Sequence, residues 1–162
     1  MESFGASLEE IEDVYRRRGR EFFRLALAHT GRSEAAKDAA QEGFAHAVRG
    51  RATFRREGKL DAWVARCVIN AALDASRNPV GRSADERGDE SGELPTDDDL
   101  PALRAAIRRL PPRQRNALFL RYYLDFEYAA IAEALEIEVG TVSATLHAAR
   151  ASLRDSLQEV YR

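Results

Sequence analysis

Polar and aromatic side chains between residues 59 and 77 could together capture an unpaired nucleic-acid base. The spacing predicts a helix here, with Arg66, Asn70 and Arg77 in one narrow stripe and Trp63 at its edge. An aromatic ring can stack on a base, an amide can hydrogen-bond its edge, and a guanidinium can hold a phosphate. The alternative is that Trp63 belongs to the core, as large aromatics at helical spacing usually do, and that the stripe is a solvated face.

Two helical patterns later in the chain could place a helix in a DNA groove. The first comprises Tyr128, Ile131, Ala132 and Leu135, and the second Val142, Leu146, Ala149 and Leu153. They meet at Glu136 and Ile137, and Gly140 opens the second pattern. This spacing predicts a helix-turn-helix, whose second helix can enter the major groove. An ordinary helical hairpin with no DNA role is the alternative.

A small acidic patch lies within an otherwise basic block. Ser33 is the expected N-cap of a helix that displays Asp38, Gln41 and Glu42. The same helix should bury Ala40, Phe44, Ala47 and Val48. Such a patch could pair with a basic partner surface.

The elements that must position these side chains are all helical. One helix is expected over residues 8–29, with an apolar face of Leu8, Ile11, Tyr15, Phe22 and Leu25. The helix over 59–77 should bury Leu60, Val64, Cys67, Val68, Ala71 and Ala75. A further face consists of Leu100, Leu103, Ile107 and Leu110, after which Pro112 can open the next helix, expected to reach Leu124.

Charge divides the 162 residues into blocks. Residues 1–13 carry −5, residues 14–78 carry +7, residues 79–99 carry −6, and residues 100–162 carry +2. The basic block could bind a polyanion, although two solvated domains with unequal surfaces would look similar. The acidic stretch contains Pro79, Gly81, Gly88, Gly92 and Pro95, which is typical of a flexible linker between two small domains.

Several classes of site and location are disfavoured. A single cysteine, Cys67, excludes an internal disulfide and fits a reducing cytosol. The three histidines lack metal-ligand spacing, and neither a glycine-rich phosphate loop nor a nucleophile with a base partner is visible. We expect no catalytic residues, no metal and no cofactor. The apolar runs are too short to span a bilayer, and the acidic start does not resemble a signal peptide.

Together these segments resemble a bacterial RNA polymerase sigma factor of the extracytoplasmic-function (ECF) group, over about residues 10–78 and 100–157. Residues 38–44 are similar to the family's acidic polymerase-docking helix. The stretch from Phe54 through Trp63 to Asn70 and Asp74 is similar to the segment that melts and reads the −10 promoter element. Residues 110–115, 120–123, 131–133 and 140–142 look like the −35-binding domain.

The resemblance implies an all-α fold of two small helical domains. Residues 1–78 would form a region 2-like bundle, 79–99 a flexible acidic linker, and 100–162 a region 4-like helix-turn-helix domain. The implied function is to bind the RNA polymerase core and direct promoter recognition, DNA melting and transcription initiation in the cytoplasm. The implied partners are core polymerase, promoter DNA and an anti-sigma protein, without a small-molecule substrate or membrane insertion.

The resemblance also assigns residues. It assigns polymerase binding to Asp38, Gln41, Glu42 and Phe44. It assigns binding of the −10 element to Phe54, Trp63, Arg66, Asn70, Asp74 and Arg77. It assigns binding of the −35 element to Arg113, Arg115, Arg121, Thr141, Ser143, Ala144, His147 and Arg150.

This chain departs from the family pattern in its second half. Glu136 stands where Gly is usual, Glu138 where a capping Ser is common, and Ala130 where Glu is usual, while Ser143 and Thr145 replace the usual Lys and Arg. If the hinge needs positive φ, Glu136 costs about 1 kcal/mol. Two alternatives remain: a stand-alone dimeric helix-turn-helix regulator, and a sigma-like protein that binds polymerase or an inhibitor without reading a promoter.

Overall fold

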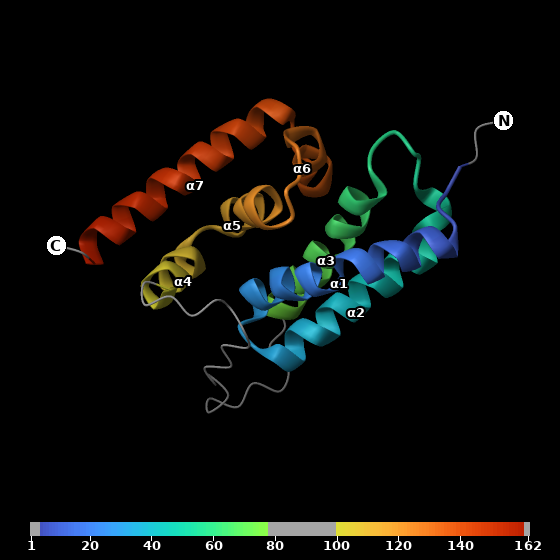
Figure 1. Cartoon of the computed structure of the whole chain (residues 1–162), viewed down its shortest axis with the longest axis horizontal. Helices are drawn as coiled ribbons and strands as arrows, with labels where there is room; N and C mark the ends of the chain where they lie inside the picture. Colours follow the sequence, from blue (N-terminus) through green and yellow to red (C-terminus); the bar gives the residue numbers. More distant parts are fainter. Residues whose placement is uncertain (1–3, 78–99, 161–162) are drawn as a thin grey trace. The chain divides into compact units, whose positions relative to one another are not determined.

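The computed structural model describes residues 4–77 and 100–160, and all of the regular structure within these ranges is helical. Figure 1 shows the helices, which belong to two compact units. The predicted linker, residues 79–99, lies outside the described residues. The expectation of an all-α fold with two helical domains is confirmed.

The first unit is a three-helix bundle. Its helices are α1 (Leu8–Thr30), α2 (Ser33–Gly50) and α3 (Leu60–Arg77), each packed on the other two, with a short 3₁₀ helix, η1 (Arg51–Thr53), after α2. The three helices lie side by side in Figure 1. Its largest fully buried side chains are Phe22, Ile11, Leu25, Val14, Val64 and Val68. Burial of each such side chain stabilises the fold by about 2 kcal/mol.

The N-terminal ends of α1 and α2 are capped differently. Ser7 and Glu10 form a reciprocal capping box at the start of α1. Gly31 ends this helix with a φ of 69°, a conformation that glycine adopts at little cost. The expectation that Ser33 caps α2 is wrong, because Ser33 is the first helical residue and the N-cap is Arg32.

The predicted apolar face of α1 is only partly buried. Ile11, Phe22 and Leu25 are in the core as expected, but Leu8 and Tyr15 are 55% and 54% exposed. In α2, Ala40, Phe44 and Ala47 are buried and Val48 is half-buried. The sequence therefore identifies the buried stripe of α2 better than that of α1.

The buried face of α3 is wider than predicted. Val64 and Val68 are fully buried, but Cys67, Ala71 and Ala75 are half-buried, as is Leu60. The core instead also takes Ala62, Trp63, Ala65, Ile69 and Ala72. This helix contacts both α1 and α2, so its apolar arc spans more than the single face that a periodicity argument assumes.

The second unit is built around one long helix. The helices α4 (Leu100–Arg109), α5 (Pro112–Leu118) and α6 (Tyr128–Leu135) all pack on α7 (Val139–Val160). Pro112 opens α5 as predicted. The continuous helix expected up to Leu124 is instead interrupted, because a π-helical turn, η2 (Phe119–Tyr123), follows α5.

The helices α6 and α7 form the predicted helix-turn-helix pair. Val142, Leu146 and Ala149 are fully buried, and Ile131 and Ala132 are buried on α6. Glu136 ends α6 with a φ of 56° and a ψ of 46°. The hinge therefore does require the left-handed conformation, and a glutamate occupies it.

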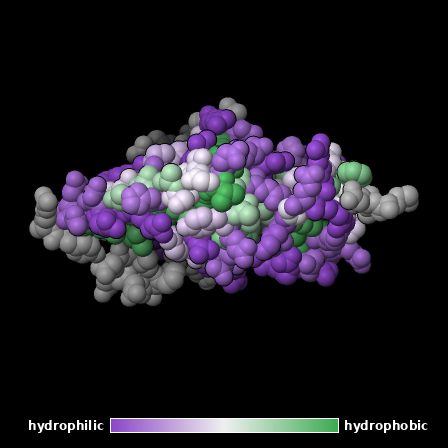
Figure 2. All heavy atoms as spheres, turned by 90° about the horizontal axis from the view of Figure 1, so that it is seen from above, coloured by the Kyte–Doolittle hydropathy of each residue, from purple (hydrophilic) through white to green (hydrophobic). Residues whose placement is uncertain are grey.

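Polar side chains cover most of the face drawn in Figure 2, where hydrophobic ones form small separate areas. Large apolar side chains that are exposed include Phe4, Leu8 and Tyr15 of the first unit and Tyr122, Val139 and Val160 of the second. Among residues 4–77 and 100–160, no helix is both long and apolar enough to cross a membrane.

Candidate nucleic-acid interface

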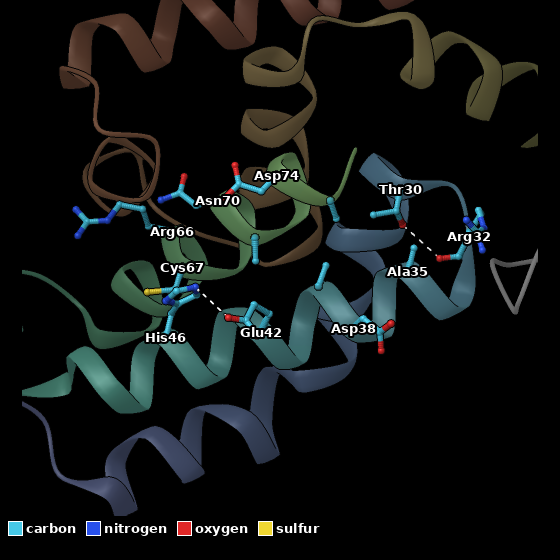
Figure 3. A pocket seen from close by; sticks show the side chains of 13 residues that line it. Thr30, Arg32, Ala35, Asp38, Glu42, His46, Arg66, Cys67, Asn70 and Asp74 are labelled. Carbon is cyan, nitrogen blue, oxygen red and sulfur yellow. Dashed lines mark hydrogen bonds and ion pairs between the residues drawn. The ribbon is translucent and has the colours of Figure 1, made fainter. Parts of the chain in front are cut away.

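A groove of about 750 Å³ runs between α2 and α3 of the first unit. Figure 3 shows its side chains. Asp38 and Glu42, from the predicted polymerase-binding set, line it on α2. Arg66, Asn70 and Asp74, from the predicted −10 set, line it on α3. The structure thus brings together residues that the sequence assigned to two separate tasks.

Helical spacing explains why these side chains line the same groove. Asp38, Glu42 and His46 lie four residues apart on α2, and Arg66, Asn70 and Asp74 lie four residues apart on α3. Residues at this spacing share one helix face. Alanines and a cysteine line the groove between these stripes, and their small side chains leave the space open: Ala35, Ala39, Cys67, Ala71 and Ala75.

The groove carries charges of both signs. Glu42 accepts from Arg49 at 3.2 Å and lies 3.2 Å from Nε2 of His46. Asp74 is 3.9 Å from Arg77, and Arg32 and Arg66 add positive charge. A groove of this kind can accept the donor and acceptor groups of a base edge, whereas Asp38, Glu42 and Asp74 would repel phosphate.

Two of the predicted polymerase-binding side chains, Gln41 and Phe44, differ in exposure. Gln41 is exposed beside Asp38 and Glu42. Phe44 is buried, with its ring 5.0 Å from that of Tyr15 and 5.7 Å from that of Phe22. Of the four side chains predicted to bind polymerase, Phe44 is therefore part of the core, and the three polar ones are accessible.

The aromatic residues predicted to contact the −10 element lie mostly in the interior. Phe54 is 5% exposed and Trp63 is 9% exposed, and their rings are 5.7 Å apart. Gly50 lies against the indole of Trp63, where an added Cβ would be 3.8 Å away. Trp63 is therefore a core residue, as the alternative interpretation of its spacing held, and a base could reach only a small part of either ring.

Arg115 occupies a structural position within the second unit. Its guanidinium is half-buried and donates to the carbonyl oxygens of Ile107, Arg108 and Leu110 at 3.2, 2.7 and 3.0 Å. These oxygens lie at the end of α4, which lacks further intrahelical donors there. Burial and the nearby Arg108 lower the pKa of Arg115. This geometry favours a helix-capping role over the predicted phosphate contact.

The other predicted arginines of this unit differ in exposure, and Arg121 is half-buried like Arg115. Arg113 is exposed at the start of α5. Arg121 donates to the carbonyl oxygen of Phe126 and lies over the ring of Tyr128, 5.5 Å from its centroid. Arg150 is exposed and donates to the hydroxyl of Tyr122. Tyrosines therefore orient two of the three guanidiniums.

The first turns of α7 present short side chains. Ser143, Ala144 and His147 are exposed, and Thr141 is half-buried. Thr145 is buried and donates to the carbonyl oxygen of Thr141 at 2.7 Å. Position 145, where the family usually has a cation, therefore faces the interior in this chain.

Sequence reasoning missed several groove residues: Thr30, Arg32, His46 and Cys67. The four-residue spacing that links Asp38 to Glu42 continues to His46 and could have identified it. The other three could not be found, because they come from helix ends or from a face expected to be core.

Burial raises the pKa of the Cys67 thiol. Among residues 4–77 and 100–160, no three metal-ligating side chains lie close enough to hold an ion.

Comparison with known proteins identifies both units. The family model of Sigma-70 region 2 matches residues 14–79, and that of Sigma-70 region 4 matches residues 100–153. The ECF RNA polymerase sigma factor SigM of Mycobacterium tuberculosis is 32% identical over 149 residues, which cover 88% of this chain and 74% of SigM. The RNA polymerase sigma factor YlaC of Bacillus subtilis is 28% identical over 160 residues, 92% of each chain.

Solved structures share this fold. The sigma factor RpoE of Bartonella quintana, in complex with the anti-sigma factor NepR, matches with a TM-score of 0.72 and 20% identity, over 93% of this chain and 98% of that one. CnrH, in complex with the cytosolic domain of CnrY, matches with a TM-score of 0.72 and 19% identity, over 95% of this chain and 91% of that one. The chain belongs to the extracytoplasmic-function group of RNA polymerase sigma factors.

Proposed function

We propose that the groove between α2 and α3 joins the two tasks of this sigma factor. A sigma factor binds the RNA polymerase core and directs promoter recognition, and this chain does so as a family member. In our assignment, Asp38, Gln41 and Glu42 on α2 dock on polymerase. The opposite wall, with Arg66 and Asn70, holds the displaced −10 strand. The observation that carries this proposal is that one groove takes side chains from both sets.

Charge gives the α2 wall its role. Asp38, Gln41 and Glu42 are all exposed on one side of α2. A basic surface of the polymerase would complement these carboxylates, which favours rapid and oriented association. Docking would also neutralise the acidic side of the groove, so that phosphate groups could approach α3 at a lower electrostatic cost.

Hydrogen-bonding capacity gives the α3 wall its role. Asn70 is exposed at the centre of the stripe and carries both donors and an acceptor for a base edge. Arg66 and Arg77 can hold the flanking phosphates. Extracting one base from the duplex stack costs a few kcal/mol, which these contacts must offset. Phe54 and Trp63 would shape this wall from beneath rather than stack broadly on the base.

The remaining assignments complete the proposal. Residues 1–78 act as the region 2 domain, 79–99 as a linker, and 100–162 as the region 4 domain that contacts the −35 element. Arg113, Arg121 and Arg150 reach phosphates, and Thr141, Ser143, Ala144 and His147 face base edges. The protein works in the cytoplasm beside the polymerase, catalyses no reaction of its own and needs no cofactor. An anti-sigma protein is a further partner.

A double dissociation tests the groove. Asn70→Ala should lower open-complex formation by at least tenfold and leave affinity for core polymerase within twofold of wild type. The double variant Asp38→Asn, Glu42→Gln should instead be defective at the binding step, with an affinity for core polymerase about tenfold lower. Competition for core polymerase and permanganate footprinting of the promoter measure the two steps. If Asn70→Ala weakened both equally, a purely structural role for α3 would be indicated.

A second candidate function is a sigma-like protein that binds polymerase without reading a −35 element. The exposed and uncharged Ser143 and Ala144 on α7, next to the exposed carboxylate of Glu138, favour it. Run-off transcription with reconstituted holoenzyme separates the two functions. If promoter use were insensitive to a scrambled −35 element, the second candidate would hold for this domain.

A further inference from the structure

The residues that precede α1 are joined to the loop between α2 and α3. The backbone N–H of Gly5 donates to the carbonyl oxygen of Phe54 at 2.8 Å, and that of Ala6 donates to the carbonyl oxygen of Arg51 at 2.8 Å. Gly5 has a φ of 90°, and a Cβ there would lie 3.0 Å from the Cα of Ala52. This close approach of two backbones needs a glycine.

Arg56 fastens the same two segments with its side chain. Its Nε donates to the carbonyl oxygen of Gly5 at 2.9 Å. Its two terminal nitrogens donate to the two carboxylate oxygens of Glu10 at 3.0 and 2.8 Å. Such a two-pronged pair fixes orientation as well as distance. Arg56 holds this position although its φ is 58°, a conformation that disfavours side-chain-bearing residues.

Glu10 serves two purposes at once. It accepts from the backbone N–H of Ser7 at 2.7 Å, which completes the capping box of α1, and it accepts both prongs of Arg56. Hydrogen bonding from Arg56, then from Ser7, lowers the pKa of Glu10 to about 2. The start of α1 and the loop therefore share one carboxylate that stays ionised at neutral pH.

The fastened loop leads directly into the proposed −10-binding wall. Phe54, two residues before Arg56, packs its ring on Trp63. Trp63 lies on α3 one turn before Arg66 and two turns before Asn70. Side chains of the Arg56–Glu10 pair are 42% and 39% exposed, so the pair adds little to global stability. Its main effect should be local, on the conformation of residues 51–59.

We propose that the segment from Phe4 to Glu10 positions the loop of residues 51–59 against the −10 strand, with Glu10 and Arg56 as the positioning pair. This inference rests on the proposed role of α3 in promoter opening. Loops held by few contacts sample many conformations, whereas a loop that recognises a single base must adopt one defined conformation. The contacts of Gly5 and Glu10 with this loop select that conformation before DNA binds, which lowers the entropic cost of ordering the loop on binding.

Two conservative variants of the full chain, reconstituted with core polymerase, test the proposal. Glu10→Gln keeps the capping box, because Gln at this position also accepts from the N-cap, but it loses the charged partner of Arg56. Arg56→Asn removes the two-pronged contact, and asparagine tolerates the positive φ. Both should slow open-complex formation by about tenfold, flatten the base preference at a −10 position in a randomised promoter library, and leave core affinity within twofold.

A matched control lies on the same helix. Glu12 pairs with Arg16 at 2.7 Å in an exposed contact that does not involve the loop. Glu12→Gln should leave the opening rate and base preference unchanged. Wild-type opening rates and base preference in Glu10→Gln and Arg56→Asn, with Asn70→Ala still defective, would overturn the positioning role alone. Normal opening by Asn70→Ala as well would overturn the proposed function of α3, and this inference with it.

Thermal unfolding separates positioning from simple stabilisation. If Glu10→Gln lost core affinity and thermal stability in parallel with opening, the pair would be merely structural and the proposal would fail. The expected pattern is a tenfold change in opening with an unfolding temperature close to wild type. Should Arg56→Asn unfold, Glu10→Gln still decides the matter, because it alters one atom and retains the helix cap.

Discussion

The two units differ in how their polar and charged side chains are used. In the first unit, Asp38, Asn70 and Arg77 point outward from a tightly packed bundle and remain exposed. In the second, Arg115 caps another helix and Arg121 rests on a tyrosine ring, while the exposed start of α7 carries Ser143 and Ala144. The first unit also uses cations within its own fold, since Arg17 and Arg18 pair with Asp61, but it keeps a polar stripe exposed for a partner, whereas the exposed start of α7 offers the uncharged Ser143 and Ala144. We therefore expect specific contacts to be concentrated in the first unit.

Two glycines, one in each unit, differ in the space around them. At Gly43 of α2, an added Cβ would lie 2.6 Å from the Cα of Val68, so Gly43→Ala must push α2 and α3 apart. We expect a loss of about 3 kcal/mol in the free energy of unfolding. Gly140 of α7 is the matched control, because a Cβ there meets nothing within 4 Å among the described residues. Gly140→Ala should stabilise by about 0.5 kcal/mol.

Chemical denaturation of the full chain measures both changes. Equal and small effects at the two positions would show that the close α2–α3 crossing is not a constraint in solution. The contrast between the two glycine positions would then have no energetic basis.

Substitution of Asp61, a residue of α3 in the first unit, should have the next largest effect on stability. Its carboxylate is 17% exposed and accepts from Arg17 at 3.2 Å and Arg18 at 3.1 Å. Burial by itself would raise the pKa of Asp61, but the hydrogen bonds and charges of Arg17 and Arg18 outweigh it, and the pKa is lowered. Asp61→Asn should cost about 2 kcal/mol at pH 7.

The pH dependence of this cost has a definite sign. Because the folded pKa lies below the unfolded value of about 3.9, the pair stabilises the fold above that value. The stabilisation is lost as the pH falls through the folded pKa, so wild type and Asp61→Asn should converge in acid. The exposed Asp155 of α7 is the control, and Asp155→Asn should change stability by less than about 0.5 kcal/mol at any pH. A gap between wild type and Asp61→Asn that persisted in acid would exclude the ion-pair explanation.

Glu136 sharpens the comparison from the side of the second unit. Its φ of 56° is one that glycine adopts freely, so Glu136→Gly should stabilise this unit by about 1 kcal/mol. Glu136→Ala is the control, because it removes the carboxylate and retains the strained backbone. Differential scanning calorimetry distinguishes them. A gain from Ala as large as that from Gly would assign the cost to charge rather than to conformation.

The smallest expected effect concerns duplex DNA. Glu138 is exposed and its carbonyl oxygen accepts from the N–H groups of Thr141 and Val142, so it stands at the start of α7. Glu138→Ser removes a carboxylate near the expected phosphate path and supplies a common N-cap. Binding of the full chain to a −35 duplex should tighten about threefold, an effect that salt weakens. Fluorescence anisotropy measures it, with Glu159→Gln near the other end of α7 as the charge-matched control. If Glu159→Gln tightened binding equally, net charge alone would be responsible.

Much of the fold could be predicted from residue spacing. The helices α1, α3 and α7 follow from periodicity, and the opening of α5 follows from Pro112. The strained hinge at Glu136 was implied only by the resemblance to a family that usually has glycine there. The width of the α3 core could not be predicted, because it depends on contact with two neighbouring helices. The π-helical turn at η2 leaves no recognisable pattern in the residue types.

Part of the candidate site could be predicted one residue at a time, but its residues could not be placed in one groove. Asp38 and Asn70 are 32 residues apart, and only the packing of α2 on α3 brings them to a common groove. The capping contacts of Arg115 were equally invisible, because an arginine that binds phosphate and one that binds carbonyl oxygens have the same sequence signature. The brace formed by Gly5, Glu10 and Arg56 likewise depends on a contact across 46 residues.

The close approach of Gly43 to Val68 has a consequence for where on the promoter the strands would open. The close crossing of α2 and α3 at Gly43 and Val68 limits their relative movement, so the backbones at Asp38 and Asn70 should keep a nearly constant separation. In the proposed arrangement, the bundle then sets the distance between the surface of the polymerase and the extruded nucleotide. The site where strands first separate would be set by the protein's own dimensions, and the DNA would have to bend or twist to meet them.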